Sequence, residues 1–142
     1  MIRTSVLSLL LLFLIVPVFA QEQITEEEVN QEKLLIEANR EKLLGNYDKA
    51  ITMLRELFRQ DGERAAVAYE LGRLLHAEGQ LEEAIKYLKI ATEKEPSNEW
   101  YLKFLADVYQ QEGRNREGAE LYQKLVEQSP DDQYLAFRLS YF

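Results

Sequence analysis

One histidine, no cysteine and a few short runs of carboxylates are the side chains of this sequence best suited to chemistry. The single histidine, His76, has neither a second histidine nor a cysteine with which to form a zinc site or an activated thiolate. No nucleophile motif accompanies it, as a triad would require. We therefore expect His76 to line a surface, and we predict no catalytic residue, no metal site and no cofactor.

The carboxylate runs Glu26–Glu28 and Glu82–Glu83 are typical of solvated helix faces, because adjacent helical residues do not face each other. The segment from Gly113 to Gly118 contains two glycines but is a turn between two helical runs, not a phosphate-binding loop. Its Arg114 and Arg116 supply too little positive charge to bind nucleic acid in a chain of net charge −8. We expect no nucleic-acid partner.

Residues 1–20 have the composition of a secretory signal peptide. Arg3 gives a positive start, Val6 to Val16 form an eleven-residue apolar core, and Val18 and Ala20 are small residues before a cleavage point. We predict cleavage after Ala20, export to the periplasm, and no stable membrane span in the mature chain. The alternative is an inner-membrane anchor formed by an uncleaved segment 4–20, which is short for a span.

The remaining chain repeats with a period of 34 residues. Glycines mark the period at Gly45, Gly79 and Gly113. Two further columns hold small residues, and prolines close two of the units: Ala38, Gly72 and Ala106; Ala50, Ala84 and Gly118; Pro96 and Pro130. A register that several columns share without an insertion indicates a repeat architecture.

Each unit has the pattern of two helices joined by a tight turn. In the second unit, apolar residues at helical spacing run from Ala68 to Leu75 and again from Leu81 to Ala91, with Gly79 between them. Gly79 suits a helix end that requires positive φ. Gly72 and Ala84 are small where the two helices must approach most closely.

These residues resemble the tetratricopeptide repeat family, whose pattern the second unit follows as Ala68-x-x-Leu71-Gly72-x-x-Leu75, then Ala84-x-x-x-Leu88, then Pro96. The resemblance covers units 31–64, 65–98 and 99–132, and the first helix of a partial fourth unit over 133–142. It implies an all-α solenoid of antiparallel helix pairs, wound as a right-handed superhelix, with about three repeats plus the start of a fourth.

The resemblance also implies a non-enzymatic role in binding a partner protein or peptide, since the first helix of each unit lines the concave surface of such arrays. Carried onto this sequence, the inward-facing residues are Leu35, Asn39, Lys42, Tyr69, Arg73, His76, Trp100, Lys103, Asp107, Gln110, Phe137 and Tyr141. Aromatic and arginine side chains commonly anchor interfaces. Scattered cations suit a partner segment with apolar anchors and some acidic residues. The alternative is that Trp100 and Tyr69 pack between neighbouring helices.

The two ends of the array depart from the pattern. Residues 21–30 form an acidic leader, in which Thr25 and Glu28 predict a capping box for a helix from about Glu26 to Leu44. Glu37 and Glu41 replace apolar residues, which we interpret as the polar face of a capping unit. At the other end, Asp131 and Asp132 favour a helix start, and the aromatic residues that follow suggest self-association through this last helix.

The sequence thus predicts an exported scaffold that binds a partner peptide or helix. Two alternatives stay open. The chain is the N-terminal docking or regulatory part of a longer envelope protein, or its aromatic groove carries a glycan or another small ligand.

Overall fold

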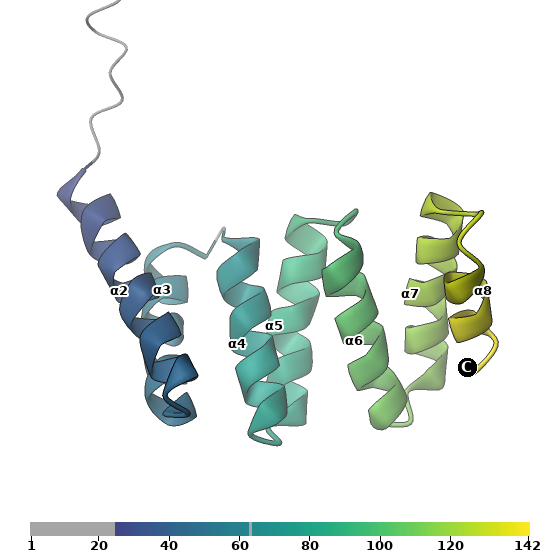
Figure 1. The fold of residues 1–142 in the computed structure, drawn as a ribbon, viewed down its shortest axis with the longest axis horizontal. Coiled ribbons are helices and arrows are strands. Elements are labelled where there is room, and N and C mark those ends of the chain that lie inside the picture. The colour runs from purple at the N-terminus through teal and green to yellow at the C-terminus, as the bar shows by residue number, and fades with distance from the viewer. Residues whose placement is uncertain (1–24, 63) are drawn as a thin grey trace, which may run out of the picture. The chain divides into compact units, whose positions relative to one another are not determined.

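The computed structural model describes residues 25–62 and 64–142, so the predicted signal peptide at 1–20 and residues 21–24 of the leader lie outside the described residues. The described part forms seven helices and no strand (Figure 1). They are α2 (Glu26–Leu43), α3 (Tyr47–Gln60), α4 (Ala65–Ala77), α5 (Leu81–Lys94), α6 (Glu99–Gln111), α7 (Asn115–Gln128) and α8 (Gln133–Leu139). The all-α fold class predicted from the periodicity is confirmed.

The chain divides into two compact units, residues 1–30 and residues 31–142, and the first contains the start of α2. The capping box predicted there is present. The Thr25 backbone N–H donates to Glu28 Oε2 (2.6 Å), and the Glu28 backbone N–H donates to Thr25 Oγ1 (3.1 Å). These bonds satisfy backbone donors that a helix start leaves without intrahelical partners, which explains why α2 begins at Glu26.

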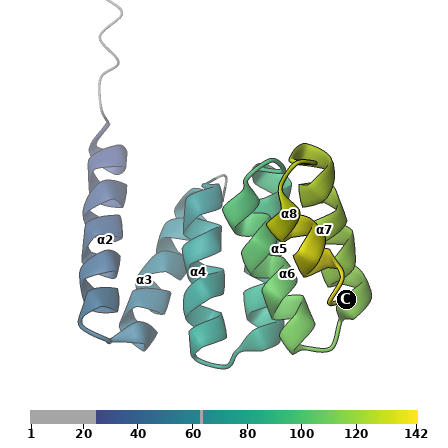
Figure 2. The ribbon, with the colours of Figure 1, turned by 45° about the vertical axis from the view of Figure 1, so that its right-hand side comes forward.

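Within the second unit, first helices (α2, α4, α6, α8) alternate with second helices (α3, α5, α7). Figures 1 and 2 show α4 with α5, and α6 with α7, as adjacent antiparallel helices joined by short turns. The three glycines of the 34-residue period make these turns, with φ of 78° at Gly45, 73° at Gly79 and 70° at Gly113. Side-chain-bearing residues rarely adopt this conformation, so the spacing of the glycines fixes where each pair reverses.

Small residues sit where the helices of a pair approach each other. A Cβ added at Gly72 would lie 2.5 Å from Leu88 Cγ and 3.1 Å from the Ala84 carbonyl oxygen. Gly118 of α7 makes a different close approach, to the chain after α8. A Cβ there would lie 2.3 Å from Phe142 Cε1, so this glycine admits an aromatic ring that also packs against Tyr122. The small-residue columns are buried throughout, at Ala38, Gly72, Ala106, Ala50, Ala84 and Gly118.

The C-terminal ends of α5 and α7 and the N-terminal end of α8 also agree with the sequence pattern. α5 ends at Lys94 and α7 at Gln128, each two residues before the closing proline, Pro96 or Pro130. The Asp132 side chain accepts hydrogen bonds from the backbone N–H groups of Tyr134 (2.9 Å) and Leu135 (3.4 Å), which caps the start of α8.

The core runs continuously from one helix pair to the next. One cluster joins Leu54 of α3 to Leu71 and Leu74 of α4, and a second joins Ile85 of α5 to Val108 of α6. A third cluster joins α6, α7 and α8 and includes Leu102, Leu125 and Leu135. Buried apolar side chains therefore join each of these pairs to its sequence neighbours, as in other repeat proteins.

The interpretation of Glu41 as part of the polar face of a capping unit is wrong, because its side chain is buried. Its side chain is only 2% exposed. It accepts hydrogen bonds from Asn46 Nδ2 (2.7 Å), Lys49 Nζ (2.9 Å) and an Arg40 guanidinium nitrogen (3.2 Å). The carboxylate occupies the column that holds Leu75 and Tyr109 in the next units, because polar partners from the turn and from α3 satisfy it.

Gly72→Ala is expected to destabilise the protein by about 1–3 kcal/mol, because the new methyl group overlaps Leu88 in a buried contact. The measurement is urea denaturation followed by circular dichroism. Gly62→Ala is the matched control, since a Cβ there meets its nearest atom at an ordinary 3.6 Å. Equal stability of the two variants would contradict the close-approach interpretation.

Glu41→Gln is expected to reduce stability at neutral pH and to matter less in acid. Hydrogen bonds from Lys49 and Asn46 lower the pKa of Glu41 from 4.5 to about 2. The carboxylate therefore stabilises the fold fully above pH 4.5, and this contribution is lost as the pH falls towards 2. The difference in unfolding free energy between wild type and variant, measured by denaturation across this range, should shrink as the pH falls. The exposed Glu82→Gln serves as control, and a pH-independent difference for Glu41→Gln would argue against a buried anion.

Candidate functional site

The exposed sides of the first helices form one connected surface. It consists of Trp100 and of three columns at the 34-residue spacing: Leu35, Tyr69, Lys103 and Phe137; Asn39, Arg73, Asp107 and Tyr141; and Lys42, His76 and Gln110. We call it the first-helix surface. Direct contacts link α2 to α4, α4 to α6 and α6 to α8, so its members belong to neighbouring helices rather than to separate sites.

A shared carboxylate holds the surface together between α2 and α4. Lys42 Nζ donates to Glu70 Oε2 (2.8 Å), and an Arg73 guanidinium nitrogen donates to Glu70 Oε1 (3.0 Å). The side chains of Lys42 and Glu70 are about one quarter exposed, at 27% and 24%. Two predicted site residues, Lys42 and Arg73, thus meet at one carboxylate that was not among the predicted site residues.

A hollow of about 520 Å³ lies beside this ion pair, between α2 and the start of α4. Its lining combines aliphatic, amide and charged groups: Leu35, Asn39, Lys42, Arg64, Ala65, Ala66, Val67, Glu70 and Glu95. The cations in it already have carboxylate partners, since Arg64 pairs with Glu32 and with Asp61, each at 3.1 Å. The hollow is therefore suited to an uncharged side chain.

Aromatic rings join α4 to α6. The Tyr69 ring lies 4.4 Å from the Tyr101 ring and 5.8 Å edge-on from Phe104, measured between centroids. The Arg73 guanidinium carbon lies 5.8 Å from the centre of the Tyr69 ring. Burial raises the pKa of Tyr69. For Tyr69, the alternative of packing between neighbouring helices is therefore correct.

His76 belongs to the same junction. Its ring lies 5.4 Å edge-on from Phe104, and its Nε2 is 2.7 Å from Gln111 Oε1. A ring that contacts a phenyl group and a side-chain amide has the surroundings of a structural surface residue, which agrees with the expectation that His76 lines a surface.

Trp100 does not pack between neighbouring helices. It is the chain's single tryptophan and is 76% exposed, although its backbone N–H is fixed by the Asn98 side chain at 3.2 Å. Lys103 lies one turn further along α6, and its Nζ donates to Glu99 Oε2 (2.8 Å). The indole is thus presented to solvent beside a cation that is already paired.

An ion pair joins α6 to α8. Asp107 accepts hydrogen bonds from the Arg138 guanidinium and from the Tyr122 hydroxyl, the latter at 3.2 Å. Burial and, secondarily, the Asp107 carboxylate raise the pKa of Tyr122 to about 12. Arg138 also contacts Gln110, so both predicted residues of this part of α6 hold α8 in place.

The aromatic residues at the end of the surface stay largely exposed. Phe137 is 56% and Tyr141 60% exposed, and their rings meet edge-on with centroids 4.9 Å apart. Tyr134 is exposed as well. The surface therefore changes along its length, from polar groups around Glu70 to aromatic groups on α6 and α8.

The residues that join one first helix to the next were not among the predicted site residues. Glu70, Phe104 and Arg138 each contact the preceding first helix, and all three lie 34 residues apart. That shared column was the available signal. It was overlooked because its members differ completely in chemistry, being an acid, an aromatic and a base.

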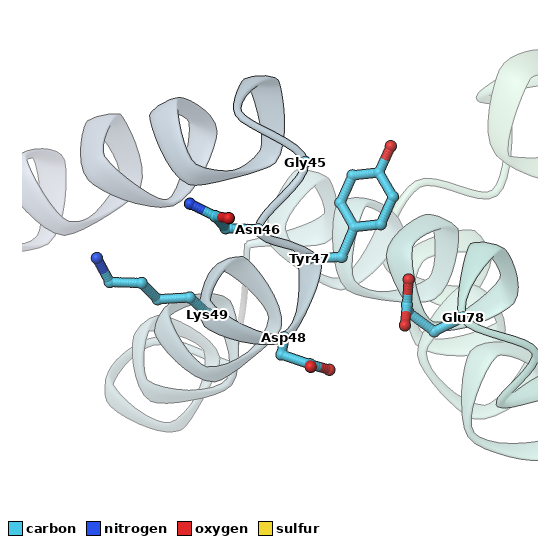
Figure 3. Close-up of a pocket in the computed structure, with 6 residues that line it drawn as sticks. All are labelled: Gly45, Asn46, Tyr47, Asp48, Lys49 and Glu78. Atoms are coloured by element: carbon cyan, nitrogen blue, oxygen red, sulfur yellow. The ribbon is translucent and has the colours of Figure 1, made fainter.

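A second hollow, of about 440 Å³, lies at the first inter-helix turn (Figure 3). Its lining is Gly45, Asn46, Tyr47, Asp48, Lys49 and Glu78. Figure 3 shows Lys49 pointing away from Glu78, and Lys49 and Asn46 both bond to the buried Glu41. Its polar groups thus support the turn, and the first-helix surface remains the stronger candidate.

The described residues contain neither a candidate metal cluster nor a candidate membrane span. Nowhere in that part of the chain do three or more histidine, aspartate or glutamate side chains gather as a metal ion would need. None of its helices is both long enough and apolar enough to cross a membrane.

Comparison with known proteins places the fold in a family. The family model described as Tetratricopeptide repeat matches residues 43–108 and 75–139, which together exceed half of the chain. The chain therefore belongs to the tetratricopeptide repeat family. No curated protein matches it in sequence.

Solved structures share the fold. MamA has a TM-score of 0.67 at 24% identity, with 75% of this chain and 62% of MamA covered, so the chain spans less than two thirds of that protein. The type III secretion chaperone SycD of Yersinia enterocolitica, in complex with a peptide of the translocator YopD, has a TM-score of 0.68 at 20% identity, with 84% of this chain and 92% of SycD covered. The first TPR of Spaghetti (RPAP3), bound to an HSP90 peptide, has a TM-score of 0.67 at 14% identity, with 78% and 88% covered.

A double-mutant cycle on Lys42→Met and Glu70→Gln should give a favourable coupling of about 0.3–1 kcal/mol, because the pair is only partly exposed and links two helices. The coupling should weaken at high salt, which screens partly exposed charges. Thermal or urea unfolding at two salt concentrations measures it. The exposed pair Arg59 and Glu56 within α3 is the control. If the coupling between Lys42 and Glu70 is zero or unfavourable, the two side chains do not form a stabilising ion pair.

Proposed function

We propose that this protein is a protein-interaction scaffold that binds a segment of a partner protein along the first-helix surface. The exposure of Trp100 carries the proposal. Trp100 is the chain's single tryptophan and is 76% exposed on α6, and tryptophan is among the residue types that most often anchor an interface. The hollow between α2 and α4, on the same surface, provides a place for a second anchor.

The charges of the surface favour a segment that binds mainly through apolar side chains. Lys42 and Arg73 share Glu70, and Lys103 is paired with Glu99. An acidic partner would have to compete with these carboxylates and would meet them at close range, which is costly. This refines the expectation of acidic residues in the partner, because the cations that would attract them are already neutralised.

The structural neighbours support binding of this kind. SycD is seen with a peptide of YopD, and the RPAP3 repeat with a peptide of HSP90. Repeats of this architecture therefore hold peptide segments in other proteins, and we extend that capacity to this chain. The proposed role is non-enzymatic and requires no cofactor.

We further propose that the protein acts after export to the periplasm. This part of the proposal is supported by the sequence of residues 1–20, with its basic start, apolar core and small residues before position 21.

Simultaneous Trp100→Ala and Arg73→Ala should reduce capture of partner proteins from the cell-envelope fraction at least tenfold, as loss of an interface anchor implies, without unfolding the chain. Both side chains are exposed, so circular dichroism should stay unchanged. Quantitative mass spectrometry of the captured proteins is the measurement.

The matched control replaces an apolar residue and an arginine away from this surface, Leu44→Ala with Arg59→Ala, and should keep full capture. Undiminished capture by the folded Trp100 and Arg73 variant would refute the proposed site. A glycan or small ligand that alters Trp100 fluorescence without any protein partner would favour the carrier alternative instead.

A further inference from the structure

One column of the repeat supplies the residue with which a first helix contacts the first helix before it. Its members are Ile36, Glu70, Phe104 and Arg138. Glu70 of α4 pairs with Lys42 of α2. Phe104 of α6 packs on Tyr69 and His76 of α4. Arg138 of α8 bonds to Asp107 and Gln110 of α6. In all three cases, the member of this column reaches back to the preceding first helix.

The first member of the column has no such contact on the described part of the chain. Ile36 of α2 is 67% exposed. Leu43 lies two helical turns further on the same face and is 83% exposed. The residues equivalent to Leu43 in the next two units are Ala77 and Gln111. Gln111 of α6 contacts His76 of the preceding first helix, α4. The backward-facing stripe of α2 is therefore apolar and open.

A neighbouring column limits what this stripe can accept. Leu74 and Val108 are buried in clusters that include residues of the preceding second helix, Leu54 of α3 and Ile85 of α5. In α2 the same column holds Arg40, which is exposed and paired with Glu37. The face of α2 is thus polar where a second helix would pack and apolar where a first helix would pack.

The forward-facing positions of α8 are aromatic and open. Tyr69 and Asp107 belong to the columns that receive the following first helix. Phe137 of α8 and Tyr141, which follows the end of this helix, occupy these two columns and are 56% and 60% exposed. Exposed apolar residues are thus found at both ends of the array, Ile36 and Leu43 at one end and Phe137 and Tyr141 at the other. They occupy the columns through which successive first helices contact each other within the chain.

We infer that α2 docks on α8 of a second copy of this chain, with Ile36 and Leu43 against Phe137 and Tyr141, and so continues the contact between first helices from one molecule to the next. The occupant is a second copy because the interface continues one that repeats three times within the chain. The contact joins two different surfaces, so it is head-to-tail and extends into a row unless the rotation closes a ring.

The test uses the absence of native cysteine. One full-length chain carries Ile36→Cys, another carries Phe137→Cys, and a short bis-maleimide cross-linker is added to the mixture. The expected product is a covalent dimer that contains one chain of each kind, formed in at least tenfold higher yield than from either chain alone. Both positions are exposed, so neither replacement should impair folding.

Leu44→Cys mixed with Phe137→Cys is the control. Leu44 is 64% exposed, close to Ile36 at 67%, but its column continues as Glu78 and Glu112, which are both exposed and charged. Equal yields from the Leu44→Cys and Ile36→Cys mixtures would overturn the inference, and so would a predominance of dimers linked through position 36 in both chains. Failure of the mixture to cross-link would overturn it as well.

A second measurement needs no cross-linker. Ile36→Lys blocks one end of the contact and Phe137→Lys the other, so each variant alone should lose self-association while their mixture forms a 1:1 complex. Sedimentation velocity of the two chains and of the mixture measures this. A mixture that sediments as the average of its components would refute head-to-tail docking.

The inference does not rest on the proposed binding function. Trp100→Ala with Arg73→Ala should leave the cross-linking yield unchanged, and Ile36→Lys should leave partner capture unchanged. The two ideas can therefore fail separately.

Discussion

The apolar face of each helix pair is too large for that pair to bury alone, and its burial against the next pair is the interaction on which the rest of this structure depends. Separate clusters of buried residues join α3 to α4, α5 to α6 and α7 to α8. Since every first helix is positioned by its neighbours, the 34-residue spacing places residues of one column on one surface. Function follows from this constraint, because it aligns side chains that are far apart in the sequence.

The constraint fixes position but not chemistry. The residues that link successive first helices are an ion pair at Glu70, aromatic rings at Phe104 and a guanidinium at Arg138. In two of these links, charged side chains of the surface pair with one another. The aromatic side chains of the surface that stay exposed lie at the α6 and α8 end. A partner therefore meets a surface whose polar groups hold the array together and whose apolar groups are available for binding.

Features that depend on backbone geometry could be predicted from the sequence. The positive φ of Gly79 and the close approach of Gly72 to Leu88 each require a glycine, so the residue type reveals the geometry. Ion pairs could not be predicted in this way, because long side chains choose among several partners that only the folded array brings near. Glu41 shows this most clearly, since a charged residue at an apolar position suggested solvent, yet Asn46 and Lys49 allow it to be buried. The exposure of Trp100 was likewise undecided, because indole rings suit both cores and interfaces.

The composition of the first helix has a consequence for local stability. α2 buries only Gln31, Ala38 and Glu41, whereas α4 buries seven residues and all of them are apolar or glycine. The segment of α2 from Gln31 onward therefore contributes less hydrophobic burial than α4. Its detachment is expected to cost less free energy than global unfolding. Because the hollow beside Lys42 lies between α2 and α4, such local opening would let a ligand side chain enter and then close around it.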